Sequence, residues 1–462
     1  MSRIPSSPRL ALLGAAAVAA LAALAAGGVA RSAPRLVPAV RWQRLSGPND
    51  TGQQLGLARL ENGTLHVAWN RGNPGPTAIY DTRFSPTGAK LGTSTVVTGW
   101  SGAGGLALLA LPGGTLRLFA TGARKVGDAN GGVNTFTAPA SGTGWTFDSA
   151  DIWGGPPAAA ATTVGAALAK SGDPVTAWAG AAVSNVQSGV AAGDGTPICA
   201  CDALTADIAT DAGSGAVIVA GETIGKPFGT YVERALPAAG GRVVLPSAAQ
   251  DAGDAGISGR IGASGVYVAW TDGNRPGVSK PAIHLTRYGG ATRTLARGAF
   301  TFAKVFPGPQ GRLWITWGDT TDGVFVTRSN RAVGRFEPVR KLPSPPRASF
   351  LGNAAGEGSQ GALDLFVQQD IAGGGYWHAH VLARDTLTAA VSKKSNGARM
   401  VTFRVTDAGD PVAGARITTG HGGPLTTSAA GTAILTLRAG TTVHATATAG
   451  GYAPASATVS AS

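Results

Sequence analysis

The stretch Leu65-His-Val-Ala-Trp69, which recurs almost unchanged as Val266-Tyr-Val-Ala-Trp270, decides the fold of this chain. Each copy is a short run of β-forming residues that ends in an aromatic residue and precedes a polar turn. Related runs begin at Leu116, Pro174, Ala216, Leu313 and Leu363, and successive runs start 42 to 58 residues apart. A repeat of about 50 residues is typical of four-stranded propeller blades, because one blade cannot bury both of its faces without neighbours.

The first repeat predicts the plan of a blade. Its four expected strands, from the innermost outward, are residues 54–60, 65–69, 77–84 and 94–99. Asn62-Gly63 between the first two is a strong hairpin signal. Counting second strands predicts seven blades, and the apolar, alternating run Ala39 to Leu45 is expected to supply the fourth strand of the last blade. A six-bladed ring is the alternative.

Composition favours an all-β protein. The 70 glycines and 28 prolines supply the turns that many short strands need, and 44% hydrophobic residues can fill a large core. No long segment has a sustained 3.6-residue apolar period, which argues against helical bundles and βαβ folds.

Residues 1–30 are expected to be an export signal rather than part of the fold. Arg3 and Arg9 are positive, Leu10 to Ala30 is rich in Ala and Leu, and small residues end the run. The alternative is an uncleaved membrane anchor, since the run is long enough to span a bilayer. The chain is therefore predicted to be secreted or attached to the cell surface, with no membrane span once the signal is removed.

The pattern changes after Ala383. We expect a propeller over residues 38–384, a linker over 385–397 and a small β-sandwich over 398–462, where five strand-like runs alternate with Gly/Pro turns. Pro411-Val-Ala-Gly-Ala415 and Ala430-Gly-Thr-Ala-Ile434 resemble bacterial Ig-like modules of the carboxypeptidase-regulatory type. The resemblance implies a spacer or adhesion module without catalytic residues.

The net charge of +13 and the isoelectric point near 10.2 fit anionic partners in principle. The basic residues are scattered, with the densest groups at Arg335, Arg340, Lys341 and Arg347 and at Lys393-Lys394. They do not interleave with aromatic residues as a stacking surface for nucleic acid would. We therefore expect a generally basic solubility surface on a monomer, with no nucleic-acid partner.

Four residues are candidates for crosslinking or metal binding. Cys199 and Cys201 can form a disulfide in an oxidising compartment only if the strand bends locally. His378 and His380 are expected to project from the same face of a strand, which makes them weak candidates for metal ligands. No third ligand is identifiable, so the alternative is a hydrogen-bonded pair. No cofactor is expected.

A binding face, if present, is expected on the loops that join second to third strands and blade to blade. Trp, Asp and Arg side chains there can stack on and hydrogen-bond to a carbohydrate. The candidates are Arg71, Trp100, Asp128, Trp153, Asp272, Arg275, Asp319 and Asp322. Ordinary turn chemistry is the alternative explanation for most of them.

The propeller segment resembles the secreted bacterial sialidase-like, or BNR-repeat, group. The resemblance rests on the Val-Ala-Trp phrases, on Gly334-Arg-Phe-Glu-Pro-Val339, and on a degenerate Asp box at Ala140-Ser-Gly-Thr-Gly-Trp-Thr-Phe147. The Asp box departs from the family pattern at Ala140 and Gly142, and the Arg-Ile-Pro motif that sialidases carry occurs only at Arg3-Ile4-Pro5, inside the expected export signal. The resemblance implies a propeller fold, and its missing motifs put sialidase activity in doubt.

Two functions remain open. One is an exported, non-catalytic propeller that binds a glycan or a cell-surface protein; the other is a sialidase-like glycoside hydrolase. Paired carboxylates with several arginines in the central channel would favour hydrolysis, whereas a channel lined by Gly, Ala and Ser would favour binding. The expected inner strands, such as Val164-Gly-Ala-Ala-Leu-Ala169, are poor in acidic residues. This composition favours binding.

Overall fold

A computed structural model of the chain describes residues 40–47, 54–71, 77–124, 132–149, 159–182, 185–193, 195–200, 206–223, 229–245, 255–272, 281–298, 300–319, 323–346, 351–369, 375–394 and 396–461. Their regular structure is β-strand apart from one short 3-10 helix, Pro309–Gly311. The expected export signal, residues 1–30, lies outside these ranges. Within them, no helix has the length and apolar character that crossing a membrane requires.

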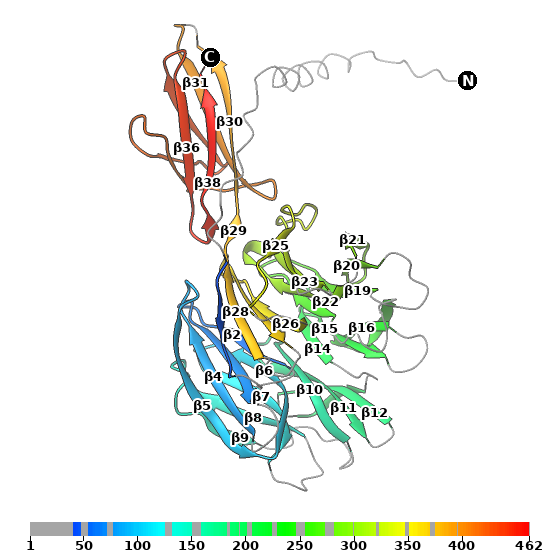
Figure 1. Cartoon of the computed structure of the whole chain (residues 1–462). Helices are drawn as coiled ribbons and strands as arrows, with labels where there is room; N and C mark the ends of the chain where they lie inside the picture. The colour runs from blue at the N-terminus through cyan, green and yellow to red at the C-terminus, as the bar shows by residue number, and fades with distance from the viewer. Residues whose placement is uncertain are drawn as a thin grey trace, which may run out of the picture. The chain divides into compact units, whose positions relative to one another are not determined.

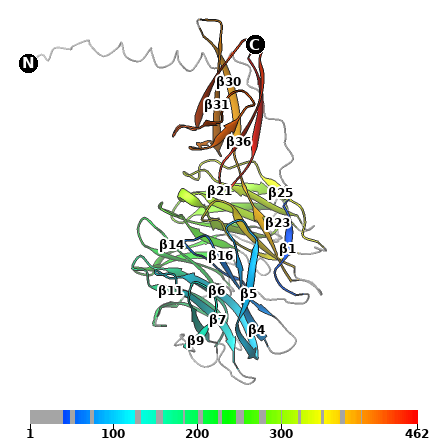
Figure 2. The same cartoon turned by 90° about the vertical axis from the view of Figure 1, so that its left-hand side faces the viewer.

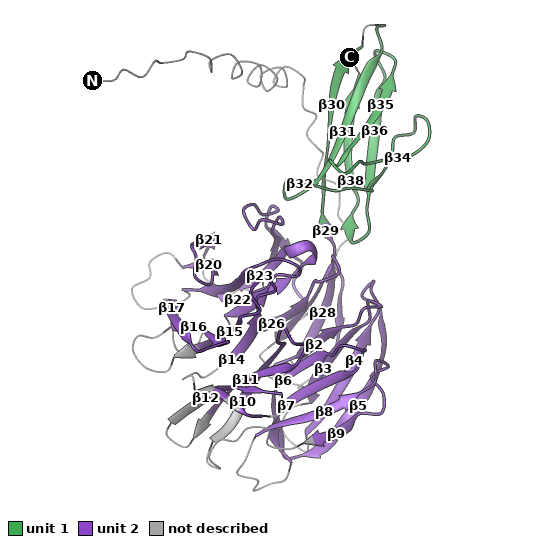
Figure 3. Ribbon diagram, turned by 180° about the vertical axis from the view of Figure 1, so that it is seen from behind, with its two compact units in different colours: residues 1–37, 384–462 green, residues 38–383 purple. Residues whose placement is uncertain are grey.

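The described residues form two compact units, which Figure 3 shows in different colours. Unit 2 lies within residues 38–383, and the described part of unit 1 begins at residue 384. The two are taken separately below.

Unit 2 contains, among its described residues, seven four-stranded antiparallel sheets. The first comprises β2 (Gly56–Arg59), β3 (Leu65–Arg71), β4 (Thr77–Phe84) and β5 (Lys90–Trp100). The second comprises β6 (Gly102–Ala110), β7 (Leu116–Ala123), β8 (Val133–Ala138) and β9 (Thr146–Ser149). The third comprises β10 (Ala159–Leu168), β11 (Pro174–Ala182), β12 (Asn185–Ala192) and β13 (Pro197–Ala200).

The other four sheets follow the same order along the chain. The fourth is β14 (Ala206–Thr210), β15 (Val217–Thr223), β16 (Gly229–Leu236) and β17 (Gly240–Leu245). The fifth is β18 (Gly256–Gly259), β19 (Val266–Thr271), β20 (Ala282–Arg287) and β21 (Thr292–Arg297). The sixth is β22 (Phe300–Pro307), β23 (Leu313–Asp319), β24 (Val324–Arg328) and β25 (Arg340–Leu342). The seventh is β26 (Leu351–Glu357), β27 (Leu363–Gln369), β28 (Gly375–Val381) and β1 (Trp42–Arg44).

The first strands of the seven sheets form a closed ring. Each of β2, β6, β10, β14, β18 and β22 lies beside the first strand of the next sheet, and β26 lies beside β2. Figure 1 shows this closure, with the blue first sheet beside the yellow last sheet, whose first strand β26 contacts β2. Unit 2 is therefore a β-propeller. The seven repeated sequence runs, of which Leu65 to Trp69 is the first, form its second strands.

The ring closes through the segment that the sequence predicts. In β1, Trp42, Gln43 and Arg44 pair antiparallel with Ala379, His378 and Trp377 of β28. The last sheet thus takes its outer strand from the start of the described chain. This pairing joins the two ends of the propeller and covers an exposed edge of β28.

The tryptophan of the repeated Val-Ala-Trp sequence has the same kinds of partner in two sheets: an aromatic ring and a threonine hydroxyl. Trp69 pairs across strands with Tyr80, their ring centroids 4.7 Å apart, and its Nε1 donates to Thr82 Oγ1 at 2.9 Å. Trp270 stacks on His284 at 4.2 Å, and its Nε1 donates to Thr286 Oγ1 at 2.9 Å. An aromatic residue followed two positions later by threonine in the third strand therefore complements the tryptophan of the second.

Glycines let the inner strands approach one another closely. A Cβ on Gly56 of β2 would lie 2.9 Å from the backbone nitrogen of Leu108 in β6. A Cβ on Gly256 of β18 would lie 2.9 Å from the Cα of Lys304 in β22. Both distances are shorter than van der Waals contact, so these positions need glycine for space.

Unit 1 consists of two sheets around one hydrophobic core (Figure 2). The first contains β30 (Thr386–Lys393), β31 (Arg399–Asp407), β32 (Asp410–Pro411) and β35 (Thr432–Leu437). The second contains β33 (Arg416–Thr418), β34 (Leu425–Thr426), β36 (Thr442–Thr448) and β38 (Ala455–Ser460). Two further short strands, β29 (Ala383–Arg384) and β37 (Tyr452–Ala453), lie outside both.

The predicted linker over 385–397 is wrong. Residues Thr386–Lys393 form β30, which pairs with β31 along its whole length. Leu387 and Ala389 alternate with exposed or half-buried residues and are buried in the core of unit 1. This alternation is the signature of a half-buried strand, so the sandwich begins before residue 398.

Unit 1 is expected to lose stability as the pH rises from about 4 to about 7. Burial, with the nearby charge of Asp407, raises the pKa of Asp385 to about 7. In the unfolded chain the pKa of an aspartate is about 3.9. Between this pKa and that of the folded state, the folded state binds more protons, so unfolding becomes easier as the pH rises. Asp385→Asn should flatten this dependence. Hydrogen exchange of the β30 and β31 amides at several pH values measures the effect, and an unchanged slope in Asp385→Asn would contradict it.

Candidate functional site

A cavity of about 230 Å³ lies at the centre of the ring of first strands in unit 2. Its lining includes residues from all seven first strands or the positions just before them. Small residues make up much of the wall: Gly56, Ala107, Gly165, Ala166, Gly256, Ala354, Ala355 and Gly356. The volume is somewhat below the roughly 300–1,000 Å³ of typical ligand pockets, so the cavity suits a small ligand or the end of a longer one.

Asp207 of β14 and Lys304 of β22 bring opposite charges to this cavity. Burial raises the pKa of Asp207, and this outweighs the lowering by the charge of Lys304 and by the backbone amides of Ile208 and Ile257. A Cβ on Gly256 would lie 3.0 Å from Cδ of Lys304. The missing side chain of Gly256 therefore leaves room for Lys304 to lie over β18, the strand between β14 and β22.

Side-chain amides add further polar groups. The Nε2 of Gln54 donates to the carbonyl of Val164 at 2.9 Å, and its Oε1 accepts from the Val164 amide at 3.3 Å. Gln54 thereby links the first sheet to the third. Its side chain passes over Gly105 of the second sheet, where an added Cβ would lie 2.5 Å from Oε1 of Gln54. Asn353 and Gln368 also line the cavity.

The cavity thus combines a wall of small and aliphatic residues with a few convergent polar groups. A carboxylate accepts and an ammonium donates hydrogen bonds, which together can fix the orientation of a polyhydroxylated ligand. Among the described lining residues, Asp207 is the only carboxylate. The sequence prediction missed Asp207 and Lys304. Both lie within first strands, and aligning the first strands of all repeats would have marked them, together with Arg59 and Glu357 at the ends of β2 and β26, as the charged positions of the ring.

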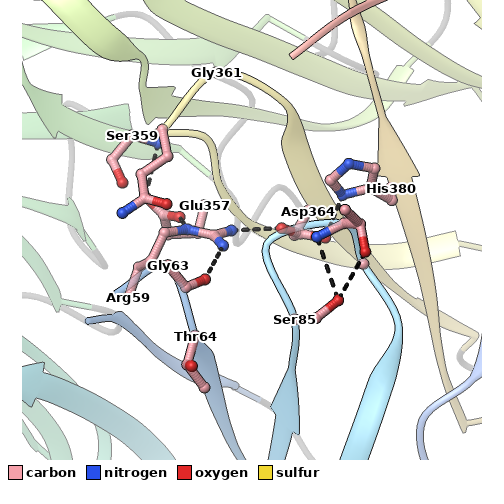
Figure 4. Close-up of polar contacts among 12 residues, drawn as sticks. Arg59, Gly63, Thr64, Ser85, Glu357, Ser359, Gly361, Asp364 and His380 are labelled. Carbon is pink, nitrogen blue, oxygen red and sulfur yellow. Dashed lines mark hydrogen bonds and ion pairs between the residues drawn. The ribbon is translucent and has the colours of Figure 1, made fainter. Parts of the chain in front are cut away.

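A second polar cluster lies where the first and last sheets meet (Figure 4). The guanidinium of Arg59, just before the hairpin of the first sheet, forms ion pairs with Glu357 and Asp364 of the last sheet. It also donates to the carbonyl of Gly63 at 2.9 Å. Although burial lowers the pKa of Arg59, the charges of Glu357 and Asp364 raise it above its ordinary value. The cluster therefore joins the two ends of the propeller by charge-assisted hydrogen bonds.

The histidine pair belongs to this cluster. His378 Nε2 and His380 Nδ1 both contact Asp364 Oδ1, at 2.8 and 2.9 Å, so the two rings share a face of β28 as predicted. The amide of Gln43 in β1 lies 2.6 Å from the other nitrogen of His378. Burial alone would raise the pKa of Asp364, but the hydrogen bonds and charges of the histidines hold it well below its usual range. Burial also lowers the pKa of His378. The described geometry is that of the hydrogen-bonded pair.

The predicted loop face is only partly described. Arg71 is exposed at the end of β3. Asp272 accepts a hydrogen bond from the Ala282 amide, and Asp319 accepts one from the Gly323 amide at 2.6 Å. Both aspartates therefore bind backbone at strand ends, as the alternative of ordinary turn chemistry predicts. Asp128, Trp153, Arg275, Asp322 and Cys201 lie outside the described residues, as do the side chain of Cys199 and the predicted disulfide.

The prediction for Trp100 is wrong. This residue ends β5, but its side chain is only 5% exposed. It packs in a core cluster between the first two sheets, with its ring centroid 5.6 Å from that of Phe136. A ring covered in this way cannot stack on a sugar. The burial follows from the neighbouring sheet, which a single repeat does not reveal.

No protein-family model and no curated protein matches the chain. Solved structures match it at low identity. A protein of unknown function from Dyadobacter fermentans is 12% identical with a TM-score of 0.44, and the match covers 75% of this chain and 100% of that one. Aleuria aurantia lectin, solved with α-methyl-L-fucoside, is 10% identical with a TM-score of 0.38, over 79% and 99% of the two chains. The polysaccharide lyase Uly1 is 11% identical with a TM-score of 0.44, over 76% and 94%. At these values the matches assign neither a family nor a function.

Proposed function

We propose that the chain is an exported, non-catalytic, seven-bladed β-propeller that binds a glycan in its central cavity, outside the cell or at its surface. The cavity carries this proposal, because Asp207 and Lys304 converge there within a wall of small and aliphatic residues. A charged donor and a charged acceptor, with the side-chain amides of Gln54, Asn353 and Gln368 in the same wall, suit the hydroxyl groups of a terminal sugar.

Unit 1 supports the extracellular part of the proposal. Its two sheets around one core fit the Ig-like spacer that the sequence resembles. Export by residues 1–30 rests on the sequence pattern alone. In this proposal the sandwich serves as a spacer module.

A sialidase-like hydrolase is the second candidate function. Glycoside hydrolysis generally uses two carboxyl groups on either side of the scissile bond. Asp207, whose pKa is raised, would suit the general acid of such a pair. The small-residue wall and the charge of Lys304 favour binding over this alternative.

A glycan array and a fluorogenic glycoside panel that includes sialosides, run on the protein without residues 1–30, test the two functions together. We expect saturable binding without turnover, and at least about tenfold weaker binding in Lys304→Met, because a hydrogen bond to a charged group contributes about 1.5–3 kcal/mol.

Lys90→Met is the matched control, since Lys90 is exposed on the outer strand β5 of the first sheet. Turnover that disappears in Asp207→Asn would replace the binding proposal by hydrolysis. Equal glycan affinities in the Lys304→Met and Lys90→Met variants would remove the cavity as the site.

A further inference from the structure

Five arginines that are scattered in sequence meet at one end of the fifth and sixth sheets. Arg260 follows β18, Arg287 ends β20 and Arg293 lies in β21. Arg331 and Arg335 lie in the turn that connects β24 to β25. First and third strands both end at this edge of their sheets, because neighbouring strands are antiparallel. The antiparallel order therefore brings these five positions together.

Hydrogen bonds tie the cluster together. Arg260 donates to the carbonyls of Ser264 at 2.8 Å and Gly311 at 2.7 Å, and also to the carbonyl of Arg331. Arg293 donates to the carbonyl of Gly334 at 2.7 Å. The fifth sheet thus holds the Arg331–Arg335 turn of the sixth sheet from two sides. A Cβ on Gly265 would lie 3.2 Å from Arg287 Nε and 3.7 Å from Arg260 Cδ, which places Arg287 in the same cluster.

Hydrogen bonds and a buried side chain hold this turn in one conformation. The side-chain oxygen of Asn330 accepts hydrogen bonds from the amides of Gly334 at 2.9 Å and Arg335 at 3.1 Å. Val333 has a φ of 54°, a conformation that is unfavourable for a β-branched residue, and its side chain is only 7% exposed in the core between the fifth and sixth sheets. Arg331 and Arg335 are exposed on either side of this buried valine. The backbone that carries the two arginines is therefore ordered before any ligand arrives.

The carboxylates near the cluster are already engaged. Asp211 accepts hydrogen bonds from the amides of Gly213 at 3.0 Å and Gly265 at 2.9 Å. Partial burial would raise the pKa of Asp211, but these amides and the charge of Arg287 lower it. Glu337 is buried and lies 3.9 Å from Arg340. Asp211 therefore stays ionised and offsets part of the charge of Arg287, so the five arginines leave an excess of positive charge at this surface.

We propose that Arg287, Arg331 and Arg335 form a binding surface for a carboxylate-bearing polysaccharide. Guanidinium groups bind carboxylates through paired hydrogen bonds, and a preordered backbone lowers the entropy lost on binding. A polyanion with repeated carboxylates can engage several arginines at once. The inference deepens the proposed function: it rests on the protein being a glycan binder, and it assigns to that glycan acidic sugars along its length.

The aromatic content of the surface favours a polysaccharide over a nucleic acid. Single-stranded nucleic acids bind on exposed aromatic rings that stack on their bases. Phe336, the aromatic residue next to the turn, is covered by the guanidinium of Arg293 at 5.6 Å from its ring centroid. A chain of uronic acids needs only charge and hydrogen bonds from this surface.

Binding of the full chain to polygalacturonate, dextran and single-stranded DNA of equal length tests the inference. We expect affinity for polygalacturonate that falls with added salt, and none for dextran. The combined variant Arg287→Gln, Arg331→Gln and Arg335→Gln should bind polygalacturonate at least about tenfold more weakly. The matched control, Arg404→Gln with Arg416→Gln and Arg438→Gln, removes the same charge from exposed positions of unit 1 and should change affinity less than about twofold.

Equal loss in the two combined variants would show that net charge alone attracts the polymer and would overturn the inference. Tighter binding of DNA than of polygalacturonate would also overturn it. Lys304→Met separates this surface from the proposed cavity site. Polygalacturonate binding that survives Lys304→Met but not the loss of the three arginines would support the surface even if the cavity binds nothing.

Discussion

Asp364→Asn is expected to destabilise the propeller by about 3–5 kcal/mol, because it breaks a buried ion pair by removing one partner. Asp364 is fully buried and accepts hydrogen bonds from Arg59, His378 and His380. Asparagine is almost the same size, but it is neutral and turns one acceptor oxygen into a donor. Arg59 would keep only one of its two carboxylate partners, Glu357. The first and last sheets would also lose the carboxylate that binds side chains from both of them.

Tryptophan fluorescence during urea unfolding measures this effect in unit 2 alone, because all ten tryptophans of the chain lie between residues 38 and 383. Asp148→Asn is the matched control. Asp148 also pairs with an arginine, Arg117, at 2.8 Å, but the two side chains are 43% and 22% exposed. An exposed pair contributes about 0–1 kcal/mol, so equal destabilisation by the two variants would contradict the assigned role of Asp364 in ring closure.

Gly256→Ala is expected to cost about 1–3 kcal/mol of stability and to weaken ligand binding in the cavity. The added Cβ would lie 2.9 Å from both Lys304 Cα and Val305 N and 3.0 Å from Lys304 Cδ. The first two are backbone atoms, so β18 and β22 must move apart, which is the cost of overpacking a closed ring. Lys304 would also be displaced from its place over β18, which changes its charge interaction with Asp207.

Gly102→Ala is the control for this substitution. Gly102 begins the inner strand β6, and a Cβ there would meet no atom within 4 Å. Alanine should be neutral or slightly stabilising at that position, because it reduces the freedom of the unfolded chain. Urea unfolding compares the two variants, and titration with a glycan identified on the array compares their affinities. A neutral Gly256→Ala would show that the inner strands have more space than the structure indicates.

Much of the blade architecture can be predicted from the sequence because its signals are local. The second strands follow from runs such as Leu65 to Trp69, and the hairpin before them follows from Asn62-Gly63, where Gly63 has a φ of +86°. The outer strand of the last sheet was also predictable, since an alternating apolar run lies near the start of the chain. The error at β30 was avoidable, because Leu387, Ala389 and Val391 alternate in the same way.

The candidate sites were not predictable to the same degree. The charges of Asp207 and Lys304 interact across β18, where Gly256 carries no side chain and leaves room for Lys304. The densest basic group in the sequence is divided by the fold: Arg335 joins the arginine cluster, whereas Arg340 is buried over Trp314 and Lys341 lies 3.9 Å from Asp319. Trp100 carried a sequence signal for a binding platform and is instead part of the core.

The sequence by itself determined that this protein is built of repeated four-stranded β units with a separate β-rich segment at its C-terminal end, because strand period and turn residues act over a few neighbouring positions. Only the tertiary structure decided which charges meet. Arg59 and Asp364 are 305 residues apart, and they form an ion pair because the ring brings the first sheet against the last. Contacts of this kind depend on the order and spacing of all the sheets between them, which no single repeat contains.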